Sequence, residues 1–103
     1  MPGIDFREVR ALIAISQVLD LGGFEVVARS GDQVRGPCPI HGSTTPRSRS
    51  FSANLRKNTF RCFGCGAAEN QLDLWVAISR LPLINAAEDL CSRLSIKVPL
   101  VRK

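Results

Sequence analysis

Long apolar runs are missing from this sequence. No stretch approaches the roughly 20 consecutive apolar residues that a membrane-spanning helix needs, and the N-terminus lacks the charged-then-apolar pattern of an export signal. A chain of 103 residues is also too short for two domains with separate cores of any size. We therefore expect one small cytoplasmic domain whose four cysteines are reduced rather than paired in disulfides.

Groups suited to catalysis are also few. The chain has one histidine, and its nine acidic residues are scattered apart from the adjacent Glu88 and Asp89. An enzyme would need a nucleophile beside a base, or several carboxylates able to hold two metal ions. Neither arrangement is visible, so we expect a binding module that catalyses no reaction by itself.

Acidic residues are absent from residues 33–68. The same segment carries six positive charges, on Arg35, Arg47, Arg49, Arg56, Lys57 and Arg61. A basic segment without counter-charges favours a polyanionic partner. On charge alone, a solvated basic face with no partner remains the alternative.

The apolar spacing predicts helices near both ends of the chain and strands between them. One amphipathic helix is expected over residues 5–21, begun by a capping box from Asp5 to Glu8 and ended by two glycines. Strand-like runs then predict two hairpins, 24–29 with 33–36 and 50–55 with 59–62. Two further helices are expected, from Glu69 to about Leu81 and over residues 84–94.

These elements predict an α+β fold: a small ribbon whose antiparallel sheet is flanked by helices on one face and open on the other. We expect the domain to cover residues 1–97, with the ribbon proper at about 24–66 and helices before and after it. Residues 98–103 are expected to form a basic tail, with the chain loose from Lys97 onward.

Two ligand pairs indicate a metal site. Cys38 and His41 are separated by two residues, as are Cys62 and Cys65, and twenty residues lie between the pairs. This is zinc-ribbon spacing, because two tight turns can aim four side chains at one ion. Three thiolates and one imidazole fill all four positions of a tetrahedron, so we expect one structural Zn²⁺.

The fourth cysteine, Cys91, has no partner at ligand spacing. It lies on the apolar stripe of the last predicted helix. We therefore expect Cys91 to be a buried core residue.

A set of motifs resembles the zinc-binding domain of bacterial DNA primases: Cys38-Pro39-Ile40-His41, Thr45-Pro46, Ser50-Phe51 and Cys62-Phe63-Gly64-Cys65-Gly66, followed by Asn70 and Asp73. The similarity extends from the first helix to about Ile96. The resemblance implies a zinc ribbon whose ligands are three cysteines and one histidine. It also implies that the domain contacts single-stranded template DNA and helps to start RNA primers.

The sequence departs from that family in two ways. The family usually continues into a catalytic domain with clustered acidic residues, whereas this chain ends at residue 103. The family's compact Thr-Pro-Ser-Phe stretch is interrupted here by Arg47-Ser48-Arg49.

Single-stranded nucleic acid is bound where positive charge accompanies aromatic rings on which bases stack. Strand alternation places Thr59, Arg61 and Phe63 on the sheet face opposite Phe60 and Cys62. Phe60 is expected in the core, as is Phe51, whereas Phe63 fits a core position and a stacking position equally. The predicted DNA contacts are Arg61, Phe63, Arg49, Arg56, Lys57, Arg47 and Arg35.

A protein-interaction module is the competing hypothesis. The ribbon would then dock onto a polymerase, helicase or recombinase in replication or in a mobile element. Strong salt dependence of DNA binding would favour the nucleic-acid hypothesis, and a salt-insensitive complex with a protein would favour the competitor.

Overall fold

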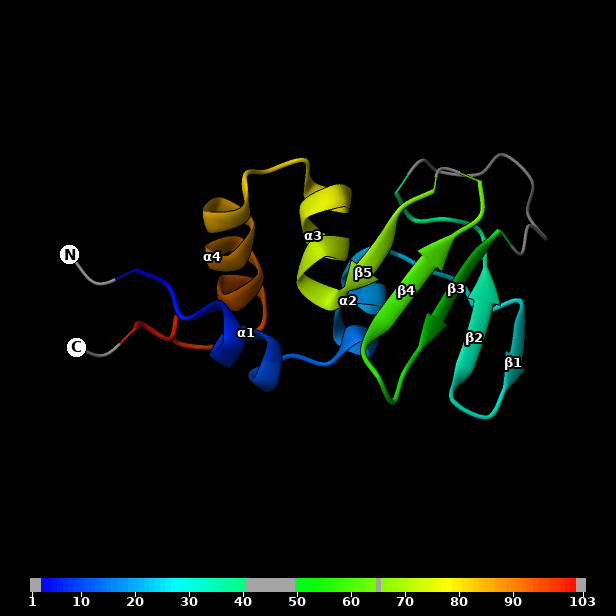
Figure 1. Ribbon diagram of the computed structural model, residues 1–103, viewed down its shortest axis with the longest axis horizontal. Coiled ribbons are helices and arrows are strands. Elements are labelled where there is room, and N and C mark those ends of the chain that lie inside the picture. Colours follow the sequence, from blue (N-terminus) through cyan, green and yellow to red (C-terminus); the bar gives the residue numbers. More distant parts are fainter. Residues whose placement is uncertain (1–2, 41–49, 65, 102–103) are drawn as a thin grey trace.

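The fold is a sheet of antiparallel strands flanked by helices (Figure 1). The computed structural model describes residues 3–40, 50–64 and 66–101. Within these ranges the elements are α1 (Phe6–Leu12), α2 (Ile15–Leu21), β1 (Ala28–Ser30), β2 (Gln33–Gly36), β3 (Phe51–Asn54), β4 (Thr59–Cys62), β5 (Ala68–Asn70), α3 (Gln71–Ser79) and α4 (Leu83–Arg93). The predicted α+β class is confirmed. The longest of these helices, α4, has 11 residues, and none in the described ranges is long and apolar enough to cross a bilayer.

The strands lie in the order β1-β2-β3-β4-β5, and every neighbouring pair is antiparallel. Gly36 lies opposite Phe51, and Phe51 lies opposite Cys62. Because β2 and β4 run in the same direction, this register ends both strands at the same edge of the sheet.

The two faces of the sheet differ in polarity. One face is buried and contributes Val34, Phe51, Ala53, Phe60 and Cys62 to a single core shared with all four helices. The opposite face carries Gln33, Arg35, Ser52, Asn54, Thr59 and Arg61, since alternate residues of a strand point to opposite sides. This polar face of β2, β3 and β4 is called the open face below.

The first hairpin is shorter than predicted. β1 begins at Ala28, and the segment before it turns inward, so that the Phe24 ring lies 5.2 Å from the Phe51 ring between centroids. This approach leaves no space at Gly36, where a Cβ atom would lie 2.2 Å from the carbonyl oxygen of Glu25. Only glycine fits at the end of β2.

The single helix predicted over residues 5–21 is wrong, because the chain forms two helices there. Ile13 and Ala14 have extended backbone dihedrals, with φ and ψ of −121° and 124° and of −86° and 150°. Ile13 and Ile15 are both fully buried, whereas residues two apart on a continuous helix point to nearly opposite sides. The break brings both side chains into the core, and the Gln71 amide donates to two carbonyls at the end of α1, each at 2.8 Å.

A fifth strand, β5, takes the place of the predicted helix start at Glu69. Asn70 ends this strand and caps α3: its side-chain oxygen accepts hydrogen bonds from the amides of Leu72 and Asp73 at 3.0 and 3.1 Å. In return, the Asp73 carboxylate accepts from the Asn70 amide at 3.3 Å. This capping box begins α3 at residue 71.

The two ends of the described chain lie side by side (Figure 1). The Asp5 amide donates to the Pro99 carbonyl at 2.9 Å, and the Val101 amide donates to the Gly3 carbonyl at 2.8 Å. The prediction of a loose chain from Lys97 is therefore wrong for residues 97–101. Residues 102–103 of the predicted basic tail lie outside the described ranges.

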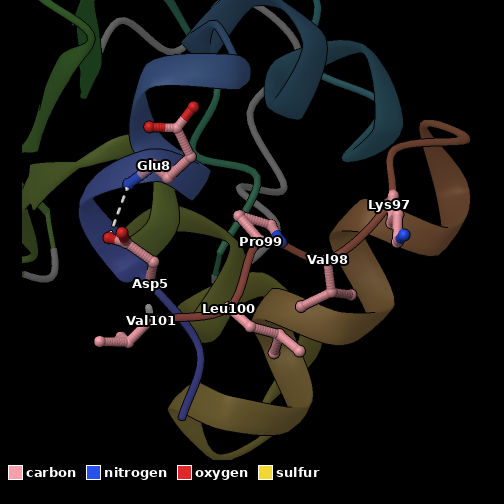
Figure 2. A pocket seen from close by; sticks show the side chains of 7 residues that line it. All are labelled: Asp5, Glu8, Lys97, Val98, Pro99, Leu100 and Val101. Atoms are coloured by element: carbon pink, nitrogen blue, oxygen red, sulfur yellow. Dashed lines mark hydrogen bonds between the residues drawn. The ribbon is translucent and has the colours of Figure 1, made fainter. Parts of the chain in front are cut away.

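A hollow of about 810 Å³ lies beside this pairing of the ends. Figure 2 shows that it is lined by Asp5 and Glu8 at the start of α1 and by residues 97–101. The Asp5 carboxylate accepts from the Glu8 amide at 3.1 Å, which confirms Asp5 as the predicted cap of the first helix.

Candidate metal centre and nucleic-acid surface

One cysteine from each predicted ligand pair lies at the same edge of the sheet. Cys62 is the last residue of β4, and Cys38 follows the end of β2 by two residues. Both side chains are buried, with 1% of their surface exposed. The strand register therefore places two sulfur atoms, 24 positions apart in sequence, at the same edge of the sheet.

The other two predicted ligands, His41 and Cys65, lie outside the described residues. Accordingly, no group of three metal-ligating side chains is found within the described part of the chain. The assignment of all four ligands stays a prediction.

The surroundings of Cys38 and Cys62 fit a zinc ion. The Ile40 amide lies 3.4 Å from the Cys38 sulfur, which is the kind of donor that supports a metal-bound thiolate. After Cys62 the chain reverses tightly: the Gly66 amide donates to the Cys62 carbonyl at 2.9 Å, with Gly66 at a φ of +76°. Glycine suits this turn because it adopts a positive φ without steric cost.

Cys91 is separate from this edge of the sheet. It lies in α4 and is fully buried in the core. Burial raises the pKa of its thiol, because an apolar environment disfavours the thiolate. The prediction that Cys91 is a core cysteine is confirmed.

Three predicted DNA contacts come together on the open face. The Phe63 side chain is 60% exposed, and the guanidinium carbons of Arg35 and Arg61 lie 5.7 and 5.4 Å from its ring centroid. Both arginines lie opposite Ser52 in the strand register, so they flank the same point of the sheet. These three residues, Phe63, Arg35 and Arg61, are called the Phe63 cluster.

The other two phenylalanines of the segment belong to the core. Phe51 is fully buried and Phe60 is 5% exposed, with their rings stacked at a centroid distance of 5.7 Å. The core prediction is confirmed for both. Phe63, for which the sequence left two alternatives, is the exposed ring of the three.

Arg56 and Lys57 lie apart from the Phe63 cluster. They are in the turn between β3 and β4, at the other end of β4 from Cys62. Lys57 nevertheless lines the same shallow hollow as Arg61 and Phe63, of about 330 Å³, on the open face. Arg47 and Arg49 lie outside the described residues.

Four uncharged residues of this hollow were not among the predicted DNA contacts: Gln33, Ser52, Asn54 and Thr59. The Gln33 amide donates to the Ser52 hydroxyl, which explains how Ser52 is accommodated in a buried position. In the sequence, only the alternation along each strand shows that these residues share a face. They can be assigned to one site only when the register between the strands is also known.

Comparison with known proteins points to the family that the sequence motifs resemble. The model of the CHC2 zinc finger family, a zinc ribbon of DnaG type, matches residues 4–103. The DNA primase of Geobacillus stearothermophilus is 37% identical over 73 residues, which cover 71% of this chain and 12% of that protein. The DNA primase of Halalkalibacterium halodurans is 31% identical over 99 residues, covering 96% of this chain and 16% of that protein.

A solved structure shares the fold. The crystal structure of Aquifex aeolicus primase, containing the zinc-binding and RNA polymerase domains, aligns with a TM-score of 0.73 and 28% identity over 95% of this chain. That alignment covers 23% of the Aquifex chain. The present chain therefore spans less than a quarter of this structure and about one sixth or less of the two primases above.

Proposed function

The chain belongs to the CHC2 zinc finger family of DNA primases, and on this premise we propose that it is a zinc ribbon that binds single-stranded template DNA in primer synthesis. The observation that carries the proposal is the Phe63 cluster. An aromatic ring is 60% exposed beside two guanidinium groups on a polar sheet face. Single-strand sites combine these two features, because bases stack on the rings while cations neutralise phosphates.

Zinc has a positioning role in this proposal. We assign one Zn²⁺ to Cys38, His41, Cys62 and Cys65, a closed set of four ligands whose bound ion supplies structural cross-linking. Phe63 directly follows Cys62, and its amide donates to the Ser50 carbonyl at 2.7 Å. Fixing Cys62 therefore also fixes the backbone from which the Phe63 ring projects.

The test compares single-stranded DNA binding by the parent protein with that of Arg61→Ala and Phe63→Ala at matched salt. We expect Phe63→Ala to lose about 1–3 kcal/mol of binding free energy through lost stacking. Arg61→Ala should weaken binding to all sequences. If about three to five phosphates are neutralised, log affinity should fall against log salt with a slope of roughly −2 to −3.5.

Two controls separate the site from general effects. Arg7→Ala removes the same charge from an exposed position on α1, whose main contacts are with α3 and α4, and should change affinity less than Arg61→Ala. Phe63→Trp keeps an aromatic surface and should retain binding. Unchanged affinity in both Arg61→Ala and Phe63→Ala, with zinc and fold retained, would contradict the proposal.

The 103-residue chain by itself is expected to make no primer when given template and ribonucleotides. Nucleotidyl transfer depends on carboxylates that hold metal ions, and the acidic residues of this chain are scattered. Any activity would require a separate polymerase domain. Template-dependent synthesis by the pure chain, abolished by substitution of one of its acidic residues, would show that it is an enzyme.

A protein-docking function is the second candidate, supported by exposed apolar residues. Leu83 and Ile84, at the start of α4, are 43% and 56% exposed. A polymerase, helicase or recombinase that contacts this site would bind with little salt dependence. Loss of such a complex in Ile84→Ser, with DNA binding unchanged, would favour docking as a separate function.

A further inference from the structure

The turn between β3 and β4, residues 55–58, carries the exposed side chains of Arg56 and Lys57. The turn is stabilised by Asn54, the last residue of β3. The Asn54 side-chain oxygen accepts hydrogen bonds from the amides of Arg56 and Lys57 at 3.0 and 2.9 Å. One asparagine oxygen thus fixes the backbone of both cationic residues.

The same turn is tied to the rest of the molecule at both of its ends. At its start, the Leu55 amide donates to the Asp32 carbonyl in the β1–β2 turn at 2.8 Å. At its end, the Asn58 side-chain oxygen accepts a hydrogen bond from the Ile15 amide at 2.9 Å. Ile15 is the first residue of α2, where backbone amides have no partner inside the helix.

Asparagine suits position 58 for two reasons. The residue has a φ of +55°, a left-handed conformation that asparagine adopts more readily than most residues. Its side chain also supplies the acceptor for Ile15. The basic turn is therefore held on a helix 43 positions away in sequence, rather than left free at a hairpin tip.

We propose that Asn54 and Asn58 are positioning residues of the DNA site, holding Arg56 and Lys57 where they meet phosphates of the strand whose base stacks on Phe63. The inference rests on the proposed function. Lys57 and Phe63 line the same hollow from opposite ends of β4, so one strand can contact both. A turn that is already ordered loses less conformational entropy on binding than a mobile one.

The experiment measures the salt dependence of single-stranded DNA binding for Asn58→Gly, Lys57→Ala and the double variant. Glycine tolerates the positive φ but lacks the acceptor oxygen. Lys57→Ala should weaken binding about threefold to tenfold and reduce the salt slope by about 0.7, the contribution of one phosphate. Asn58→Gly leaves net charge unchanged, yet it should weaken binding and reduce the slope as well.

The double variant tests whether Asn58 acts through the cationic turn. Its affinity should fall by less than the product of the two single effects, because residues that act as a unit are not additive. A residue that only stabilises the fold would lower the melting temperature without changing the salt slope of the folded protein. Should Asn58→Gly fail to fold, Asn54→Ala tests the turn from within, with the same expected reduction in slope.

Two results would overturn the inference, and they distinguish failure of the positioning role from failure of the proposed function. If Lys57→Ala and Phe63→Ala weaken binding while Asn58→Gly and Asn54→Ala keep both affinity and slope, the positioning role is wrong and the DNA site stands. If Lys57→Ala and Phe63→Ala both leave binding unchanged in zinc-loaded protein, the proposed function is wrong and the positioning role with it.

Discussion

Removal of the metal by a chelator is expected to unfold the sheet region. Structural zinc sites in small domains contribute roughly 10–16 kcal/mol of binding free energy that acts as folding free energy, which is comparable to the whole stability of a domain of this size. Cys38 and Cys62 are members of the same core as the helices. Loss of the ion should therefore also expose Trp75, and tryptophan fluorescence together with circular dichroism would follow the transition.

Elemental analysis of single variants tests the ligand assignment. Cys38→Ser, Cys62→Ser and Cys65→Ser should each lose zinc, whereas Cys91→Ala should keep one ion per chain. Cys91 provides a matched control because it is as deeply buried as Cys38 and Cys62 but lies in α4. Equal zinc loss in Cys91→Ala and Cys65→Ser would defeat the assignment.

Phe51→Ala is expected to destabilise the zinc-loaded protein by about 3–5 kcal/mol, the usual cost of removing a fully buried phenylalanine ring. Phe51 is fully buried between the rings of Phe24 and Phe60, at centroid distances of 5.2 and 5.7 Å. It also lies opposite Cys62 in the strand register. The cavity would therefore form directly beside the metal-binding edge of the sheet, and urea unfolding would measure the loss.

Phe63→Ala provides the comparison for this measurement. Its ring is 60% exposed, so its removal should cost little folding free energy and should mainly affect DNA binding. Phe51→Ala should reduce DNA binding only to the extent that it unfolds the protein. Equal destabilisation by the two substitutions would contradict the division between core and surface rings.

Much of the site follows from local sequence rules. Strand alternation alone separates exposed Arg61 from buried Phe60 and Cys62, because a period of two fixes which side chains share a face. The exposure of Phe63 did not follow from the sequence, which left its core and surface positions open. Ligand spacing predicts the two pairs, since a turn of two intervening residues is a local feature. Neither rule locates Arg35 beside Phe63, which depends on the pairing of β2 with β3.

The features that sequence reasoning missed depend on contacts between distant residues. The helix break at Ile13 and Ala14 is stabilised by Gln71 and Asn58, both more than 40 positions away. β5 contains Ala68, Glu69 and Asn70, which lack the alternating apolar pattern of a half-buried strand. Pairing of the chain ends leaves no local signal, because its two partners are separated by almost the whole sequence.

The pairing of the two chain ends provides a single site at which the molecule can be attached. The domain measures 47 × 27 × 22 Å along its principal axes, and both ends of the described chain lie at one tip of the long axis, with β1, β2 and β3 at the other (Figure 1). A tag, a dye or a surface linked to either end is therefore held at the tip remote from these strands. Immobilisation through the ends would leave the far tip of the molecule, which contains β1, β2 and β3, accessible in solution.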